Sequence, residues 1–485
     1  MSDKQPSIKK NYLMNLAYQI IAIVLPIITT PYVSRVLHAD GIGAYSYTFS
    51  IATYFSLFAT LGVATYGQLE IAKCRNETEN RTILLYEIFV GRAVLTFIIV
   101  IAYFASAFIF GTYRNLYILM AINIIAVALD ISWFFQGLEL FKLTVVRNLI
   151  IRIASAILIF VFVRKESDLF IYTIIIQGST LVGNVALFPY LKRYCAVILI
   201  RKPKIFRHWK KSLSYFIPTI ATSVYTVLDK SMIGWLTNSS LQNGYYEQSH
   251  KIEQMLLLGV TALGTVTLPR MVYLFNNGNQ KEIKRLTSST LTFILCLSLP
   301  LSMGTFFIAP VLVPVFLGEG YESCVILLRV FSFLIIIVGL DNTIGKQCLM
   351  ATGKQKQFNI GVIVGALCNL LINLLLIPHF QALGAAIGSV CAELVILTIF
   401  MVFCKKMLDY KMLIKTTIKY FVVSLFMGIM VWQIGISMGV SLLTLIIQLA
   451  AGIIIYFGVL LIFRDSFVYG LFKSVLKNKL PRRNK

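Results

Sequence analysis

Apolar runs of twenty or more residues recur along the whole of this 485-residue chain. A helical run of that length matches the thickness of a lipid bilayer. The composition agrees, because 58% of the residues are hydrophobic and only 13% are charged, whereas a soluble chain carries about a quarter charged residues. The first run is too long for a signal-peptide core and lacks a small-residue cleavage site. The sequence therefore predicts an all-α integral membrane protein with many spans.

The runs divide the chain into about fourteen predicted transmembrane helices, and no soluble domain is inserted between them. The longest connection is the basic stretch "KRYCAVILIRKPKIFRHWKK", which joins the sixth span to the seventh. The predicted spans lie near residues 11–37, 42–70, 82–109, 115–137, 143–163, 169–191, 212–236, 245–275, 287–309, 323–349, 357–377, 382–404, 413–436 and 440–463.

Basic residues gather in alternate loops, and this sets the predicted orientation. With the N-terminus in the cytoplasm, the inner segments include "KQPSIKK", "KCRNETENR", the basic stretch named above, "CKKMLDYK" and the tail "KSVLKNKLPRRNK". The opposite loops, such as "LHADG", "TNSSLQNG" and "PHFQALG", are nearly free of Lys and Arg. Cytoplasmic loops retain positive charge, so both termini are predicted to be cytoplasmic. The net charge of +24 is spread over short loops, which favours contact with phospholipid headgroups over nucleic acid.

No pattern of catalytic or metal-binding residues is evident. The eight cysteines have no paired spacing, and the four histidines have no metal-ligand spacing around them. The "TGKQKQ" stretch lacks the glycine-rich loop that precedes the lysine in a nucleotide-binding motif. We therefore expect neither an enzyme nor a bound cofactor or metal.

An internal repeat relates the two halves of the chain. A shift of 201 residues aligns "KKNYL" at Lys9 with "KKSLS" at Lys210, and "GIGAYSYTFSI" at Gly41 with the segment that begins at Gln242. Gly43 then corresponds to Gly244. The predicted domains are a six-helix lobe at 1–200, a second six-helix lobe at 201–405, and two further helices with a basic cytoplasmic tail at 406–485. Six spans is an even number, so the lobes are parallel repeats, an arrangement that transporters use for alternating access.

Charged residues interrupt the apolar spans at several depths. Arg92 and Arg152 lie about 15 Å into their helices, and Glu393 lies near the middle of its own. A charge that faces lipid at mid-depth costs at least about 2.5 to 3.5 kcal/mol, so these residues should line a cavity or pair with one another. Others lie closer to a helix end: Asp130, Arg147, Asp229, Lys230, Lys251, Glu253, Arg329 and Asp341. For Arg35, Arg270 and Lys346, extension of the side chain to the membrane interface is an equal alternative to function.

The first span ends in the unusual stretch "LPIITTPYVSRVL". Pro26 and Pro31 each remove a helix hydrogen bond, so this span is predicted to bend or open there. Nearby hydroxyls could satisfy the freed carbonyls, and Arg35 follows directly.

These residues resemble a known family. "KNYLMNLAYQIIAIVLPIITTPYVSRVL" followed by "GIGAYSYTFSIATYFSLFATLGVATYG" is similar to the start of Wzx-type polysaccharide and O-antigen flippases of the multidrug/oligosaccharidyl-lipid/polysaccharide (MOP) exporter superfamily. "DKSMIGWL", "GYYEQSHKIEQ" and "TVTLPRM" extend the resemblance through the second half. One departure is His38, where such proteins commonly have glycine.

The resemblance implies a MATE/MurJ-like fold and a flippase that moves undecaprenyl-diphosphate-linked oligosaccharide across the bacterial cytoplasmic membrane. An H+ or Na+ gradient could drive it, and a polysaccharide polymerase and glycosyltransferases would be partners. By matching position, the resemblance implies substrate roles for Arg35, Asp229, Lys230, Lys251 and Arg270. Depth alone adds Arg92, Arg147 and Arg152, and the candidates for ion coupling or charge pairing are Asp130, Glu253, Asp341 and Glu393.

Two other functions stay open. A drug, cation or lipid II exporter of the same superfamily would share the fold, although a drug exporter should favour an acidic, aromatic cavity. A membrane glycan polymerase or ligase would normally carry a large external loop, and no predicted outer loop is that long.

Overall fold

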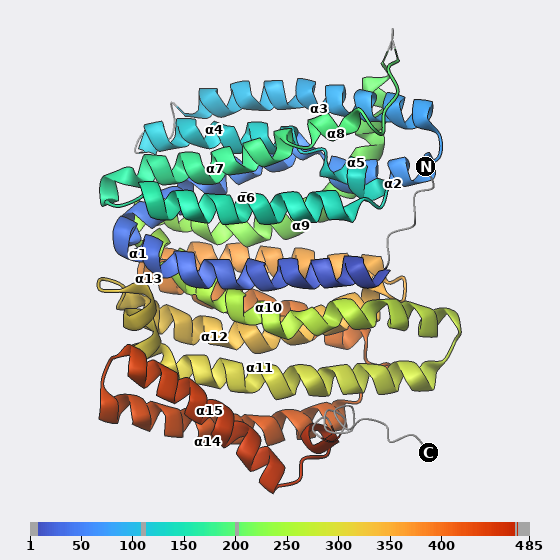
Figure 1. The fold of residues 1–485 in the computed structure, drawn as a ribbon. Helices are drawn as coiled ribbons and strands as arrows, with labels where there is room; N and C mark the ends of the chain where they lie inside the picture. The colour runs from blue at the N-terminus through green and yellow to red at the C-terminus, as the bar shows by residue number, and fades with distance from the viewer. Residues whose placement is uncertain (1–7, 108–112, 199–202, 471–472, 474–485) are drawn as a thin grey trace, which may run out of the picture. The chain divides into compact units, whose positions relative to one another are not determined.

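The computed structural model describes residues 8–107, 113–198, 203–470 and 473, and nearly all of these residues are helical (Figure 1). The elements follow in the order α1 (Ile8–Thr60), α2 (Val63–Lys73), α3 (Thr78–Ser106), α4 (Arg114–Ala128), α5 (Ser132–Gly137), α6 (Phe141–Phe162), η2 (Glu166–Asp168), α7 (Leu169–Val185), α8 (Phe188–Leu191), α9 (Ile205–Thr237), α10 (Ser240–Asn276), α11 (Gln280–Leu317), α12 (Ser323–Asn342), η3 (Thr343–Met350), α13 (Gln355–Phe403), α14 (Tyr410–Met438) and α15 (Leu442–Ile462).

The helices account for the fourteen predicted spans. Within the described residues, ten helical segments are long and apolar enough to cross a membrane. Two of these ten, Val24–Lys73 and Gln355–Phe403, are broken by a kink at His38 and at Gln381, and each corresponds to two spans. With α9 and α10, which correspond to the seventh and eighth spans, the total is fourteen. The prediction of an all-helical, multi-pass membrane protein is confirmed.

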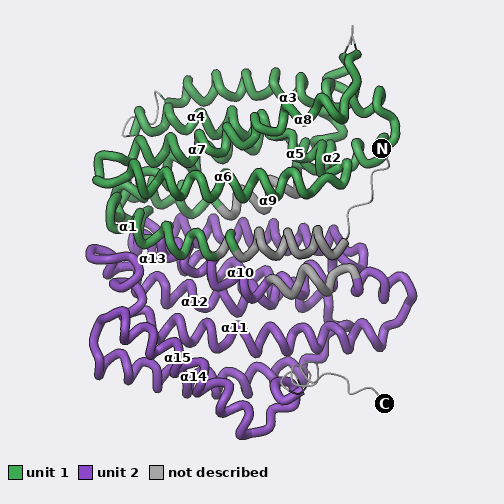
Figure 2. Tube along the Cα trace, in the orientation of Figure 1, with its two compact units in different colours: residues 1–247 green, residues 248–485 purple. Residues whose placement is uncertain are grey.

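The chain forms two compact units, residues 1–247 and 248–485 (Figure 2). In the first unit, α1 packs against α3, α4, α6 and α9, while α4 packs against α7. Because the first unit ends at residue 247, it includes all of α9 and the first turns of α10. The predicted repeat boundaries at residues 200 and 405 stay a prediction.

The break in α1 lies at His38 rather than at a proline. The helix continues through Pro26 and Pro31, whereas His38 has φ 53° and ψ 175°. That combination is almost confined to glycine, because a Cβ crowds the backbone there. The predicted opening at the two prolines is therefore replaced by a sharp kink about two turns after Pro31.

Hydroxyl groups bond to carbonyls of α1 close to the two prolines. Thr29 donates to the carbonyl of Leu25 at 3.0 Å, and Ser34 donates to the carbonyl of Thr30 at 2.7 Å. A proline frees the carbonyl four residues before it, which here means residues 22 and 27. Neither hydroxyl therefore bonds to a carbonyl that a proline frees. Each bonds to the carbonyl three residues after the freed one.

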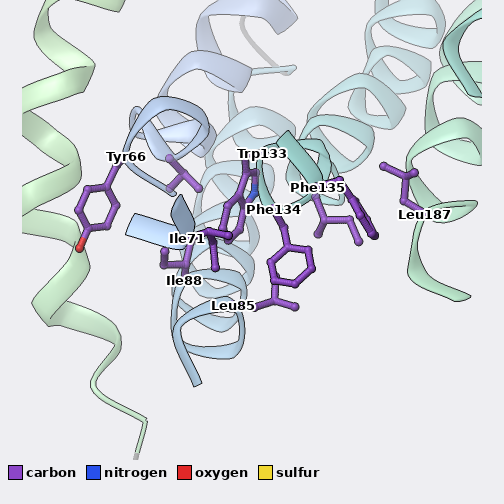
Figure 3. Close-up of a cluster of buried hydrophobic side chains, with 10 residues drawn as sticks. Tyr66, Ile71, Leu85, Ile88, Trp133, Phe134, Phe135 and Leu187 are labelled. Carbon is purple, nitrogen blue, oxygen red and sulfur yellow. The ribbon is translucent and has the colours of Figure 1, made fainter. Parts of the chain in front are cut away.

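A cluster of buried apolar side chains joins α2, α3 and α5 in the first unit (Figure 3). Its largest members come from the sequence "WFF" at Trp133–Phe135, at most 3% exposed. Tyr66 of α2 and Ile88 of α3 belong to the same cluster. Burial of such rings stabilises a domain by several kcal/mol in total, at about 1.5 to 3 kcal/mol for each large side chain. The cluster fixes α2 and α3 relative to each other.

In the second unit, α11 packs against α12 and α14, and α14 packs against α15. The hydroxyl of Tyr456 on α15 donates to the carbonyl of Cys296 on α11 at 2.7 Å. Lys419 on α14 forms an ion pair with Asp465, which follows α15. These contacts fasten the last two helices to the rest of the second unit.

Candidate translocation site

Arg92 lies inside the first unit, where α4 ends. Its side chain is buried, with the residue 5% exposed. One guanidinium nitrogen donates to the carbonyl of Asp130 at 2.8 Å, and the other donates to the carbonyl of Val127. Carbonyls at a helix C-terminus lack partners within the helix and carry partial negative charge, so a cation is favourable there. Arg92 therefore fixes the break between α4 and α5.

Arg147 on α6 meets the same break from the other side. Its guanidinium donates to the hydroxyl of Ser132 and to the side-chain carbonyl of Asn184, both at 2.6 Å. The carboxylate of Asp130 accepts from the backbone N–H and the hydroxyl of Ser132. Three residues predicted separately, Arg92, Asp130 and Arg147, are thus brought together. Two hydrogen bonds thus hold the guanidinium in place, and Arg147 as a whole residue is half-buried.

Two partners of this arrangement, Ser132 and Asn184, were missed by sequence reasoning. Asn184 on α7 also donates to the carbonyl of Ala126 at 2.6 Å, so it connects α6, α7 and α4. An asparagine within the apolar run "STLVGNVALF" was the available signal. A buried amide in a membrane span is costly without partners, and it therefore marks an internal contact.

A chain of uncharged polar groups crosses the first unit from α1 to α7. The hydroxyl of Ser56 donates to Asn123 at 2.7 Å, and Asn123 donates to Gln177 at 3.0 Å. Gln177 then donates to the hydroxyl of Tyr45 at 2.9 Å. Amides and hydroxyls of this kind are the partners that sugar hydroxyl groups require. Sequence analysis did not single out these residues, because each stands alone in an apolar run.

The other predicted residues of α1 and α6 lie apart from Arg147. Arg152 is half-buried on α6, five positions beyond Arg147, and Arg35 is exposed on α1, before the kink at His38. Their roles in substrate binding stay predictions.

Asp229 and Lys230 lie where α9 meets α1 and the start of α10. The hydroxyl of Tyr246 donates to the carboxylate of Asp229. Lys230 forms an ion pair with Glu247 at 2.6 Å, and Glu247 accepts from the hydroxyl of Ser46 at 2.8 Å. One ion pair and one hydrogen bond thus join the "DKSM" and "GYYEQ" motifs.

Close backbone contact accompanies these polar pairs. A Cβ placed on Gly43 would overlap the carbonyl of Ser240, and one placed on Gly244 would overlap the carbonyl of Ala39. Only glycine permits so close an approach. Ser240 also donates a hydrogen bond to the carboxylate of Asp40. Together these contacts hold α1 and the start of α10 against each other.

The second unit holds the other three acidic candidates. The carboxyl groups of Asp341 on α12 and Glu393 on α13 lie close enough to interact electrostatically. Glu253 on α10 is buried, and its carboxyl lies 4.0 Å from Nε2 of His250. Two negative charges in close contact repel each other, and a proton on one of them relieves the repulsion.

Two residues predicted to bind substrate, Lys251 and Arg270, lie on α10 in the second unit, where Lys251 is half-buried and Arg270 is exposed. Among the residues that the structure describes, no group of three or more His, Cys, Asp or Glu side chains could hold a metal ion.

Two family models match the chain over more than half its length. The model of the family described as "Polysaccharide biosynthesis protein" matches residues 8–275, and the model described as "Lipid II flippase MurJ" matches residues 142–451. A relative from Escherichia coli (strain K12), described as "Putative O-antigen transporter", is 22% identical over 413 residues, which are 84% of this chain and 98% of that protein.

Solved structures share the fold. A structure titled "Lipid II flippase MurJ, inward closed conformation" has a TM-score of 0.74 at 14% identity, covering 95% of this chain and all of that one. An inward-facing multidrug resistance MATE family transporter of the MOP superfamily has a TM-score of 0.56 at 12% identity, covering 84% of this chain and 99% of that one. These relatives are transporters and flippases, not enzymes. The chain belongs to the polysaccharide biosynthesis protein family and is a flippase of the Wzx type.

Proposed function

We propose that this flippase moves undecaprenyl-diphosphate-linked oligosaccharide from the inner to the outer leaflet of a bacterial cytoplasmic membrane, for polysaccharide export. In this proposal both termini are cytoplasmic, and the two repeat halves open alternately to the two sides. Glycosyltransferases would supply the substrate, and a polymerase would use the translocated repeat unit.

The observation that carries the proposal is the fixed guanidinium of the half-buried residue Arg147. A diphosphate needs cationic partners, and arginine binds phosphate oxygens with two parallel hydrogen bonds. Asn184 and Ser132 hold this guanidinium in place, so little conformational entropy is lost when an anion binds. Arg92 acts indirectly, because it fixes the α4–α5 break that carries Ser132.

The hydrogen-bonded polar groups that include Asn123 and Gln177 would bind the sugar part of the substrate. Gln177 lies on α7, which also carries Asn184. Asn123 lies on α4, and Arg92 binds the end of that helix. A sugar hydroxyl can donate and accept, so one placed between Asn123 and Gln177 would bond to both amides.

The test is transport in cells whose only flippase for this substrate is this protein. Arg147→Ala should cause lipid-linked repeat units to accumulate on the inner leaflet, and Arg147→Lys should restore only part of the transport, because lysine keeps the charge but not the paired donors. Lys142→Ala, an exposed position on the same helix, is the matched control. Full transport by Arg147→Ala at normal expression would contradict the proposed site.

We also propose H+ as the coupling ion, supported by the close approach of the Asp341 and Glu393 carboxyl groups. Asp341→Asn and Glu393→Gln should each uncouple transport from an imposed pH gradient in vesicles. An unchanged response to that gradient, with a response to Na+ instead, would overturn this part of the proposal.

Lipid II is the alternative substrate, and the match of the lipid II flippase model to residues 142–451 favours it. The two substrates share the undecaprenyl diphosphate and differ in the glycan. Depletion of the protein distinguishes them, because it would cause accumulation of either oligosaccharide repeat units or the peptidoglycan precursor.

A further inference from the structure

Three buried side chains hold the first turns of α9 against α2 and α3. The hydroxyl of Tyr66 lies 2.8 Å from Nδ1 of His208, and Nε2 of His208 lies 2.8 Å from a carboxyl oxygen of Glu87. Tyr66, Glu87 and His208 are 2%, 7% and 3% exposed, so water does not compete with these bonds. We call these three residues the α9 clasp.

The backbone around the α9 clasp is closely packed. The N–H of Lys204 donates to the second carboxyl oxygen of Glu87 at 2.7 Å, and Ser212 donates to the carbonyl of Leu61. Gly62, between α1 and α2, has φ 71°, and a Cβ there would lie 2.7 Å from the backbone nitrogen of Phe216. The first three turns of α9 are therefore held along their length.

The α9 clasp joins residues from the two repeat halves. By the repeat, α9 begins the second half, whereas Tyr66 and Glu87 belong to the first. In the proposed orientation the basic stretch before α9 is cytoplasmic, so the clasp lies at the cytoplasmic end. An opening in which the start of α9 moves away from α2 and α3 would separate His208 from Tyr66 and Glu87.

Protonation of His208 changes the charge balance of the clasp. A neutral ring donates one hydrogen bond to Glu87 and accepts one from Tyr66, which leaves a buried carboxylate without a counter-charge on its partner. A protonated ring donates to both neighbours and neutralises the carboxylate through a charge-assisted hydrogen bond. In an open clasp, water would solvate both charges separately.

Other charged groups face the α9 clasp and oppose or support a proton on His208. Arg207 on α9 is close enough to interact with both Glu87 and Tyr66, and Arg92 on α3 lines a cavity of about 10 Å³ beside His208. Glu70 on α2 and Tyr215 on α9 lie near Tyr66. Ala59 of α1 and Leu61, which follows α1, line the cavity and carry no charge. Glu87 is the charged group that bonds directly to His208, at 2.8 Å.

We propose that the α9 clasp is a proton-sensitive gate, closed at the cytoplasmic end when His208 carries a proton and released as that proton is lost. The role of this gate in transport rests on the proposed function. The contact itself does not, because all three of its residues lie in the first unit.

The test is hydrogen–deuterium exchange of the full chain in lipid nanodiscs at about pH 6 and about pH 8, on either side of the ordinary histidine range. After correction for intrinsic rates, amides of residues 205–216 should be roughly fivefold better protected at the lower pH, as about 1 kcal/mol of extra strength in a charge-assisted hydrogen bond predicts. His208→Gln should abolish this pH dependence, because glutamine can bond to Glu87 but does not titrate in this range.

Two further variants keep the test decisive. His250→Gln, in the second unit, should retain the native pH response. Glu87→Gln keeps His208 and should still lose most of the response, which covers the case in which His208→Gln does not fold. Equal protection of the native chain at both pH values, or a retained response in Glu87→Gln, would overturn the proposal. No substrate is present, so this result is independent of whether the proposed transport activity is correct.

Discussion

Gly43 and Gly244 make the same contact in opposite directions. Gly43 approaches the carbonyl of Ser240, four residues before Gly244, and Gly244 approaches the carbonyl of Ala39, four residues before Gly43. The two residues differ by 201 positions, as do Ala39 and Ser240, and 201 is the shift that aligns the repeats. A reciprocal contact between equivalent positions is what a two-fold axis between repeats produces.

The first prediction concerns this glycine contact. Gly43→Ala and Gly244→Ala should each lower the unfolding temperature and impair transport, because a methyl group would overlap a backbone carbonyl; overpacking of this kind costs about 1 to 3 kcal/mol. Gly178→Ala on α7 is the matched control, since a Cβ there meets nothing within 4 Å. Thermal unfolding in detergent and the cellular transport assay would measure both effects. If the three variants behaved alike, the close contact would not matter for the fold or the cycle.

A second prediction concerns the kink at His38. His38→Gly should raise stability by about 1 kcal/mol, because glycine tolerates φ 53° and ψ 175° without strain. His379→Gly on α13 provides the control, since this histidine has helical backbone angles and the change should be destabilising. Both can be compared by thermal unfolding. A loss of stability in His38→Gly would mean that the side chain contributes more than the strain costs.

A third prediction uses pH. Burial raises the pKa of Asp465, but hydrogen bonds from Lys419 and from the N–H groups of Val468 and Phe467 outweigh it and lower the pKa below its usual value. Such a group stabilises the fold above its unfolded pKa of about 3.9, and this contribution is lost as pH falls through the lower folded pKa. Asp465→Asn should therefore lower the unfolding temperature at neutral pH, and its difference from the native protein should shrink in acid.

The control for this pH effect is Asp409→Asn. Asp409 accepts a hydrogen bond from the N–H of Met412 at the start of α14, and asparagine caps a helix equally well. A difference between Asp465→Asn and the native protein that persisted unchanged below about pH 3 would show that packing, not charge, stabilises this contact.

The fourth prediction is topological. Tags inserted within 201–211 and after Lys485 should report the cytoplasm, and a tag at Asn238 should report the opposite side. Accessibility to an impermeant reagent in whole cells and in broken cells measures this directly. Termini on opposite sides of the membrane would contradict both the fourteen spans and the parallel repeats.

Much of the architecture could be predicted from the sequence, because hydropathy and loop charge act locally. The spans, the correspondence of Gly43 with Gly244 and the burial of Arg92 all follow from patterns within short segments. The partners of Arg92 could not be predicted in this way, since the carbonyls of Val127 and Asp130 are brought to it only by tertiary packing.

The position of the kink in α1 also could not be predicted from local sequence patterns. Proline predicts a local break, yet α1 stays helical at Pro26 and Pro31. A helix can lose one hydrogen bond at a proline and continue when neighbouring helices support it. The unfavourable angles at His38 instead accompany the close approach of Ala39 and Gly43 to α10, a contact between distant parts of the sequence.

The central claim is that this protein moves a diphosphate-linked oligosaccharide across a bilayer, and transport by the purified protein tests it most directly. Vesicles would contain undecaprenyl-diphosphate-linked oligosaccharide in both leaflets, and an impermeant glycan-cleaving enzyme would be added outside. We predict that only the outer-leaflet share is cleaved in protein-free vesicles, that the whole pool is cleaved when the native protein is present, and that Arg147→Ala resembles the protein-free vesicles. Cleavage limited to the outer leaflet with the native protein, or complete cleavage with Arg147→Ala, would contradict this account.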